Sequence, residues 1–129
     1  MNRPKATLCI AERNANIREL LRREFGREGY GVLTAGSGAE VLMRLASPVK
    51  VDLLVLDDEI ADPDGGSLAP LLARLYPGLP VVLHVYAGAE TAGQGHRRVE
   101  KGGDFERLKA AVGEVLGTNE QRPDGSVDG

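Results

Sequence analysis

The chain has 129 residues, of which 42% are hydrophobic and 27% charged, and its formal net charge at pH 7 is -3. This length and composition are those of one ordinary globular domain that can bury a core of its own. The negative charge gives no electrostatic reason to expect nucleic acid or an anionic membrane as a partner, and no apolar run approaches the roughly 20 residues of a membrane-spanning helix.

The start of the chain and its cysteine content both favour a cytoplasmic protein. The charged amino-terminal residues are not followed by the apolar core of a secretion signal. Cys9 is the only cysteine, so it can form no intramolecular disulfide. Its position in an apolar run predicts a small buried core residue rather than a reactive thiol. A reducing cytoplasm fits both observations.

The first predicted strand covers residues 6–11 and ends at two charged residues, Glu12 and Arg13. Asn14 then has the residue type of a helix N-cap. Apolar residues follow at helical spacing, which predicts a first helix that Gly29 closes. These apolar positions are Ile17, Leu20, Leu21 and Phe25.

A second strand is predicted at residues 31–35, with a second helix directly after it. Ser37 followed three residues later by Glu40 is the capping-box pattern, which predicts where this helix starts. Pro48 marks the break before the next strand. The apolar residues of this helix are Val41, Leu42, Leu45 and Ala46.

Residues 53–56 form an unbroken apolar run, as expected of a strand that is covered on both faces in a parallel sheet. The run ends at Asp57, which predicts a carboxylate at the carboxyl end of a buried strand. Open α/β sheets bind their ligands at that edge. The Asp-Pro-Asp-Gly-Gly sequence at residues 62–66 then predicts a turn that leads into a third helix.

The third helix is predicted at residues 68–75, where Pro70 is acceptable because it falls in the first turn. Residues 80–85 predict a fourth buried strand. Residues 87–95 are rich in glycine and lack apolar periodicity, which indicates a loop with at most one irregular helical turn. A weak last strand is predicted at residues 98–100.

Asp104 has the residue type of a cap for the last helix. Residues 118–129 are polar, with Pro123 and glycines, and predict a disordered tail after a domain that covers residues 1–117. The alternation of strands and helices predicts right-handed crossovers and a sheet with helices on both faces, and no repeat or second domain is evident. The apolar face of the last helix is Phe105, Leu108, Val112, Val115 and Leu116.

With this strand order and Asp57, the chain resembles the CheY-like receiver domains of bacterial response regulators over residues 6–116. The resemblance implies a flavodoxin-like, doubly wound sheet of five parallel strands in the order 2-1-3-4-5. Only 16 positions separate Val85 from Lys101, so the fourth helix is expected to be short or missing. The resemblance is carried by residues 17–21, 28–30, 52–57, 64–65 and 101.

For the site, the resemblance implies that Asp57 accepts a phosphoryl group and that Lys101 forms an ion pair with it. It also implies Mg²⁺ as a cofactor, held by Glu12, Asp57 and the backbone carbonyl of Glu59. Arg13 weakens this expectation, because it places a permanent cation where the family has an acidic metal ligand. Two positions are open for its guanidinium: it pairs with Asp57 in the place of the metal, or it lies exposed in solvent.

Further departures from the family lie near the same edge. Val85 stands where the family has a serine or threonine that contacts the phosphoryl group, and the bulky Tyr86 follows it. Arg98 stands at the position of the family's aromatic switch, and Gly102 replaces a proline. His84, in the middle of a buried strand, is expected to be a core histidine rather than a catalytic base.

The resemblance implies a receiver module of a two-component phosphorelay rather than an enzyme. Its partners would be a histidine kinase or phosphotransfer protein and a downstream protein, with a homodimer also open. The main alternative is a pseudo-receiver, which docks or dimerises without phosphorylation. A small flavodoxin-like enzyme or nucleotide binder is a third interpretation, and the absence of a glycine-rich phosphate loop argues against it.

Overall fold

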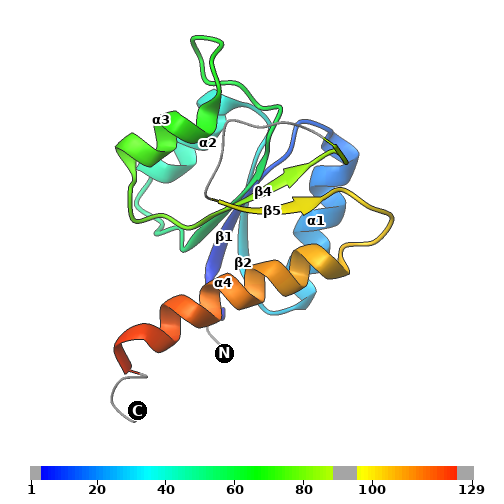
Figure 1. The fold of residues 1–129 in the computed structure, drawn as a ribbon, viewed down its shortest axis with the longest axis vertical. Coiled ribbons are helices and arrows are strands. Elements are labelled where there is room, and N and C mark those ends of the chain that lie inside the picture. The colour runs from blue at the N-terminus through cyan, green and yellow to red at the C-terminus, as the bar shows by residue number, and fades with distance from the viewer. Residues whose placement is uncertain (1–3, 89–95, 125–129) are drawn as a thin grey trace.

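The computed structural model describes residues 4–88 and 96–124, with side chains described as far as residue 117. Figure 1 shows strands and helices alternating through the first part of the chain. No helix among these residues is long and apolar enough to cross a membrane. The elements are β1 (Thr7–Ala11), α1 (Ala15–Arg27), β2 (Gly31–Ala35), α2 (Gly38–Ala46), β3 (Leu53–Asp57), α3 (Leu68–Leu75), β4 (Val81–Val85), β5 (Arg97–Glu100) and α4 (Glu106–Asp124).

The five strands form one parallel sheet in the order β2-β1-β3-β4-β5. This is the predicted order, so the flavodoxin-like architecture is confirmed. Every residue of β3 and of β4 is buried, because helices cover both faces of the sheet at its centre. The unbroken apolar run at residues 53–56 therefore reflects a central strand.

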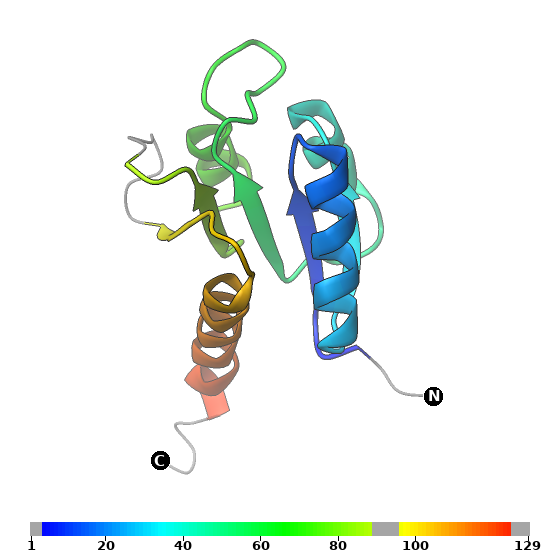
Figure 2. The ribbon, with the colours of Figure 1, turned by 90° about the vertical axis from the view of Figure 1, so that its right-hand side faces the viewer.

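Alternate residues of the same strands point into two separate apolar layers. Leu53 and Val55 of β3 pack with α1 and α4, whereas Leu54 and Leu56 pack with α2 and α3. Figure 2 shows α1 in front of the strands, and residues of α4 belong to the same apolar layer. Phe25 of α1 is fully buried in the first layer. This division follows from the two-residue repeat of a strand.

Local hydrogen bonds fix where the first two helices start. The side chain of Asn14 accepts from the N–H groups of Asn16 and Ile17, at 2.9 and 3.0 Å. The hydroxyl of Ser37 accepts from the N–H of Glu40 at 3.2 Å. The Glu40 carboxylate accepts from the N–H of Gly36, one residue before the position that a standard capping box uses.

The chain passes from β4 to β5 without a helix among the residues that the structure describes there, 86–88 and 96. The rest of the predicted glycine-rich loop, and any short fourth helix in it, falls outside the described residues. β5 lies at the edge of the sheet, and Val99 is its one buried residue. The helix after β5, α4, corresponds to the fifth helix of the predicted fold.

One sequence expectation is wrong at the carboxyl end of α4. The helix continues to Asp124, so residues 118–124 are helical where a disordered tail is predicted, while residues 125–129 are not described. Glutamate, glutamine and arginine at residues 120–122 are good helix formers, and a helix can extend through them without burying an apolar face. In Figure 1 this end of α4 projects beyond the sheet.

Candidate functional site at the carboxyl edge of the sheet

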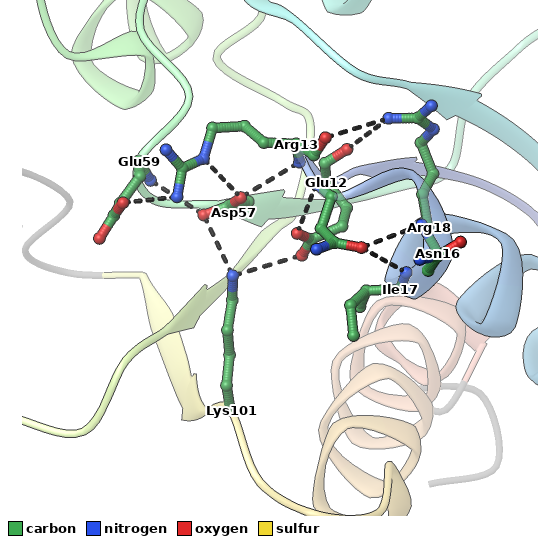
Figure 3. Close-up of polar contacts among 9 residues, drawn as sticks. Glu12, Arg13, Asn16, Ile17, Arg18, Asp57, Glu59 and Lys101 are labelled. Atoms are coloured by element: carbon green, nitrogen blue, oxygen red, sulfur yellow. Dashed lines mark hydrogen bonds and ion pairs between the residues drawn. The ribbon is translucent and has the colours of Figure 1, made fainter.

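Charged residues from three strands meet at one edge of the sheet (Figure 3). Glu12 and Arg13 directly follow β1, Asp57 is the last residue of β3, and Lys101 directly follows β5. Glu59 lies in the loop after β3. Parallel strands present their carboxyl ends at a common edge, and this is why residues so far apart in the sequence come together.

Asp57 is the centre of this cluster, and its side chain is only 1% exposed. Its Oδ2 accepts hydrogen bonds from the backbone N–H and the Nε–H of Arg13, both at 3.2 Å. Its Oδ1 accepts from the backbone N–H of Glu59 at 3.1 Å and lies 3.4 Å from Nζ of Lys101. Three hydrogen bonds and one ion pair thus surround a carboxylate that has about four lone-pair positions.

These contacts keep Asp57 ionised despite its burial. Burial by itself raises the pKa of a carboxyl group. Here the backbone N–H groups of Glu59 and Arg13 and the ammonium of Lys101 outweigh that effect, and the pKa of Asp57 lies below its ordinary value. The group that the resemblance assigns as phosphoacceptor is therefore an anion at neutral pH.

Arg13 points inward, which decides between the two positions that the sequence leaves open. Besides its two bonds to Asp57, its Nη2 lies 2.5 Å from Oε1 of Glu59. The guanidinium thus bridges two carboxylates, and the hydrogen bond to Asp57 is the main reason that the pKa of Arg13 is raised. Its side chain is 45% exposed, so one side of the bridge faces solvent.

Lys101 lies between Asp57 and Glu12, with Nζ 3.3 Å from Oε1 of Glu12. The ammonium also lies 4.6 Å from the ring centroid of Tyr86, a cation–π contact. Glu12 is 3% exposed, and its Oε2 accepts from the N–H of Asn14 at 3.0 Å. Its Oε1 accepts no hydrogen bond from the residues described by the structure, so the ion pair with Lys101 is its main stabilisation.

Arg18 supports this edge, and the sequence alone assigned it no role at the site. Its Nη1 donates to the backbone carbonyls of Glu12 and Arg13, at 2.9 and 3.5 Å. The side chain reaches back from α1 and fixes the turn that carries both residues (Figure 3). Its position on the polar side of an amphipathic helix gives no local signal of this role.

His84 lies next to the cluster without joining it. In the β3–β4 register it pairs with Asp57, and it is 4% exposed. Burial, and then the charge of Lys101, lower the pKa of His84 to about 4, so the imidazole is neutral at pH 7. It is a core histidine, as the sequence indicates. Val85 and Arg98 offer no hydroxyl or aromatic ring at the two remaining family positions.

The cluster as arranged does not fit Mg²⁺. The predicted ligands were Glu12, Asp57 and the carbonyl of Glu59, but both oxygens of Asp57 are already engaged and the cation of Arg13 lies between Asp57 and Glu59. Within residues 4–88 and 96–117, no three His, Cys, Asp or Glu side chains gather as a metal site. Mg²⁺ prefers several oxygen ligands in octahedral geometry.

Comparison with known proteins gives curated relatives and solved structures, while no protein-family model matches the chain. Transcriptional regulatory protein GlrR of Escherichia coli (strain K12) is 35% identical over 83 residues, which are 64% of this chain and 18% of that protein. DNA-binding transcriptional regulator NtrC of Rhizobium meliloti (strain 1021) is 30% identical over 136 aligned positions, which cover 96% of this chain and 28% of that protein. The chain thus spans less than a third of these relatives.

Two solved structures match nearly their whole length. Response regulator protein TrrA from Thermotoga maritima, in complex with Mg²⁺ and beryllofluoride, is 27% identical, with a TM-score of 0.74 over 85% of this chain and 98% of that chain. TrrA in complex with histidine kinase ThkA is 28% identical, with the same TM-score over 86% and 98%. The order of the strands, the residues at their carboxyl edge and these relatives agree: the chain is a receiver domain of the response-regulator type, and an atypical one.

Proposed function

We propose that this chain is the receiver module of a two-component phosphorelay and that Asp57 is its phosphoacceptor. The observation that carries the proposal is the position of Asp57: an ionised carboxylate at the carboxyl end of the central strand, held between Lys101 and Arg13. Residues 1–117 would form the receiver domain. The solved complex of TrrA with a histidine kinase supports a partner of that kind.

The chemistry follows from the groups around Asp57. A carboxylate oxygen attacks the phosphorus of a phosphohistidine, a new O–P bond forms, and the P–N bond to the histidine breaks with the electron pair returning to the ring. Lys101 and Arg13 supply positive charge beside the oxygens of the transferred group. Because Asp57 is 1% exposed, the incoming group must displace one of its present partners.

Displacing a partner is what would turn phosphorylation into a signal. Arg13 and Lys101 connect Asp57 to the loops after β1, β3 and β5. A phosphorylated Asp57 would recruit these cations and free Glu59 or Glu12. The surface around the edge would change, and a downstream protein would read that change.

The test is exposure of the protein to acetyl phosphate and, separately, to beryllofluoride. Mass spectrometry should detect one phosphoryl group on the wild-type protein and none on Asp57→Asn, and the amide resonances of Asp57 and Lys101 should shift. An unmodified wild-type protein with unmoved resonances, both with and without added Mg²⁺, would exclude phosphotransfer.

A phosphorylation-independent docking or dimerisation module is the second candidate. It is favoured by the contacts that already occupy both Asp57 oxygens and by Val85, which offers no hydroxyl to a phosphoryl group. For this candidate, Asp57→Asn should bind the partner or self-associate as tightly as the wild-type protein, and acetyl phosphate should change neither.

A further inference from the structure

Arg13 stands at a position where other receivers have an acidic residue that binds the metal ion. We infer that its guanidinium takes the place of the divalent cation, so that the phosphoacceptor site of this chain is metal-independent. The inference rests on the proposed function because it assumes that Asp57 is the phosphoacceptor.

Three hydrogen bonds and the ion pair with Lys101 already occupy both carboxylate oxygens of Asp57. Arg13 supplies two of the four donors, through its backbone N–H and its Nε–H, and both meet Oδ2. Glu59 and Lys101 engage Oδ1 from the other side. A divalent cation could bind Asp57 only by removing one of these donors.

The orientation of Arg13 is set by more than its side chain. The backbone N–H and the side chain of the same residue converge on one oxygen, and the Arg18 guanidinium holds the carbonyls of Glu12 and Arg13. Glu59 then fixes the far end of the Arg13 guanidinium. The cation is therefore held from both ends, and a rotation into solvent would break its contacts with both Asp57 and Glu59.

The charge of the cluster points the same way. Its five side chains, Glu12, Arg13, Asp57, Glu59 and Lys101, carry three negative and two positive charges, a nearly balanced set. A divalent cation would make the set positive and would lie next to a guanidinium that cannot lose its proton. Replacing Arg13 by aspartate would leave one positive charge against four negative ones, which suits a divalent cation.

The test uses Mn²⁺ as a paramagnetic probe of divalent binding on four proteins: wild type, Arg13→Asp, Arg13→Gln and Arg22→Asp. Arg22 is a half-exposed arginine of α1 that pairs with Glu19, so Arg22→Asp makes the same change in net charge away from the site. Arg13→Gln removes the cation without adding a carboxylate.

We expect Arg13→Asp to show saturable broadening of the amide resonances of residues 57, 59 and 101, with an affinity at least about tenfold above that of wild type and Arg22→Asp. Arg13→Gln should fall between them. Saturable broadening of the same resonances in the wild-type protein, with an affinity equal to that of Arg13→Asp, would overturn the inference. So would an Arg13→Asp variant that keeps a folded spectrum and gains no affinity.

A phosphorylation assay in EDTA separates this inference from the proposed function. Metal independence predicts that the wild-type protein takes a phosphoryl group from acetyl phosphate equally well in EDTA and in Mg²⁺. A strict requirement for Mg²⁺ would overturn the inference and leave the phosphoacceptor role intact. A wild-type protein that is never phosphorylated, together with the expected Mn²⁺ result, would overturn the function and support the replacement of the metal by Arg13.

Discussion

The neutral, buried His84 should make this protein less stable at mildly acidic pH. The imidazole is 4% exposed, and its Nδ1 has no hydrogen-bond partner among the described residues. Burial is the main reason that the pKa of His84 falls from 6.5 to about 4. Folding therefore holds this group in its uncharged form over the whole range between those two values.

The sign follows from proton binding in the two states. Between pH 6.5 and about 4, His84 binds a proton in the unfolded chain but not in the folded one, so acid favours unfolding. The stability that depends on the neutral imidazole is complete above pH 6.5 and is lost as the pH falls towards 4. From pH 7 to pH 5 the loss is about 2 kcal/mol, since one pKa unit is worth 1.36 kcal/mol.

Urea unfolding at pH 7 and pH 5, followed by circular dichroism, measures this loss. The wild-type protein should lose about 2 kcal/mol more of its unfolding free energy than His84→Leu, which cannot titrate at that position. His84→Gln repeats the comparison with a polar side chain, in case leucine does not pack well. His96→Gln is the matched control, because it removes the other histidine of the chain.

Equal losses between pH 7 and pH 5 in the wild-type protein and both His84 variants would refute this reasoning. Carboxylates with lowered pKa values, such as Glu24, also lose their contribution in acid, but they do so in all the variants alike. The difference between variants is therefore assigned to His84.

Three further predictions concern stability and reactivity. Gly38→Ala should destabilise the protein by about 1–3 kcal/mol, since its Cβ would lie 2.1 Å from the carbonyl oxygen of Ala61. Gly26→Ala in α1 should stabilise it by about 0.5–1 kcal/mol, since a Cβ there would meet nothing within 4 Å. Equal urea midpoints for the two variants would contradict this pair of predictions. Burial raises the pKa of the Cys9 thiol to about 12. Iodoacetamide at pH 8 should therefore label the folded protein far more slowly than the urea-unfolded protein, as measured by mass spectrometry. Similar labelling rates in the two states would count against a buried thiol. Asn14→Ala should cost about 1 kcal/mol in urea unfolding through loss of the α1 cap, and Asn14→Ser should retain most of that stability.

The sequence predicts the fold well because its signals are local and consistent. The continuous apolar run at residues 53–56 identifies the central strand, and helical periodicity identifies the helices on either side of it. Asp57 and Lys101 could be placed together because both follow strands of one parallel sheet. The caps at Asn14 and Ser37 likewise depend only on residues within one helical turn.

The direction of Arg13 could not be obtained in this way. It depends on Glu59, 46 positions away in another loop, and on Arg18, which fixes the turn from α1. Neither contact has a sequence pattern of its own. The end of α4 was also missed, because polar residues such as those at 120–122 suit an exposed helix and a disordered tail equally well.

The close contact at Gly38 gives the loop after β3 a mechanical role. The loop is internally bonded: the Asp62 side chain accepts from two of its N–H groups, and Ala61 pairs with Ser67. Its backbone rests directly on the amino-terminal end of α2, with no side chain between them to absorb a movement. A shift of this loop, which also carries Glu59, would therefore act directly on the start of α2, so a change at the buried end of β3 would reach the helix that presents the exposed Met43.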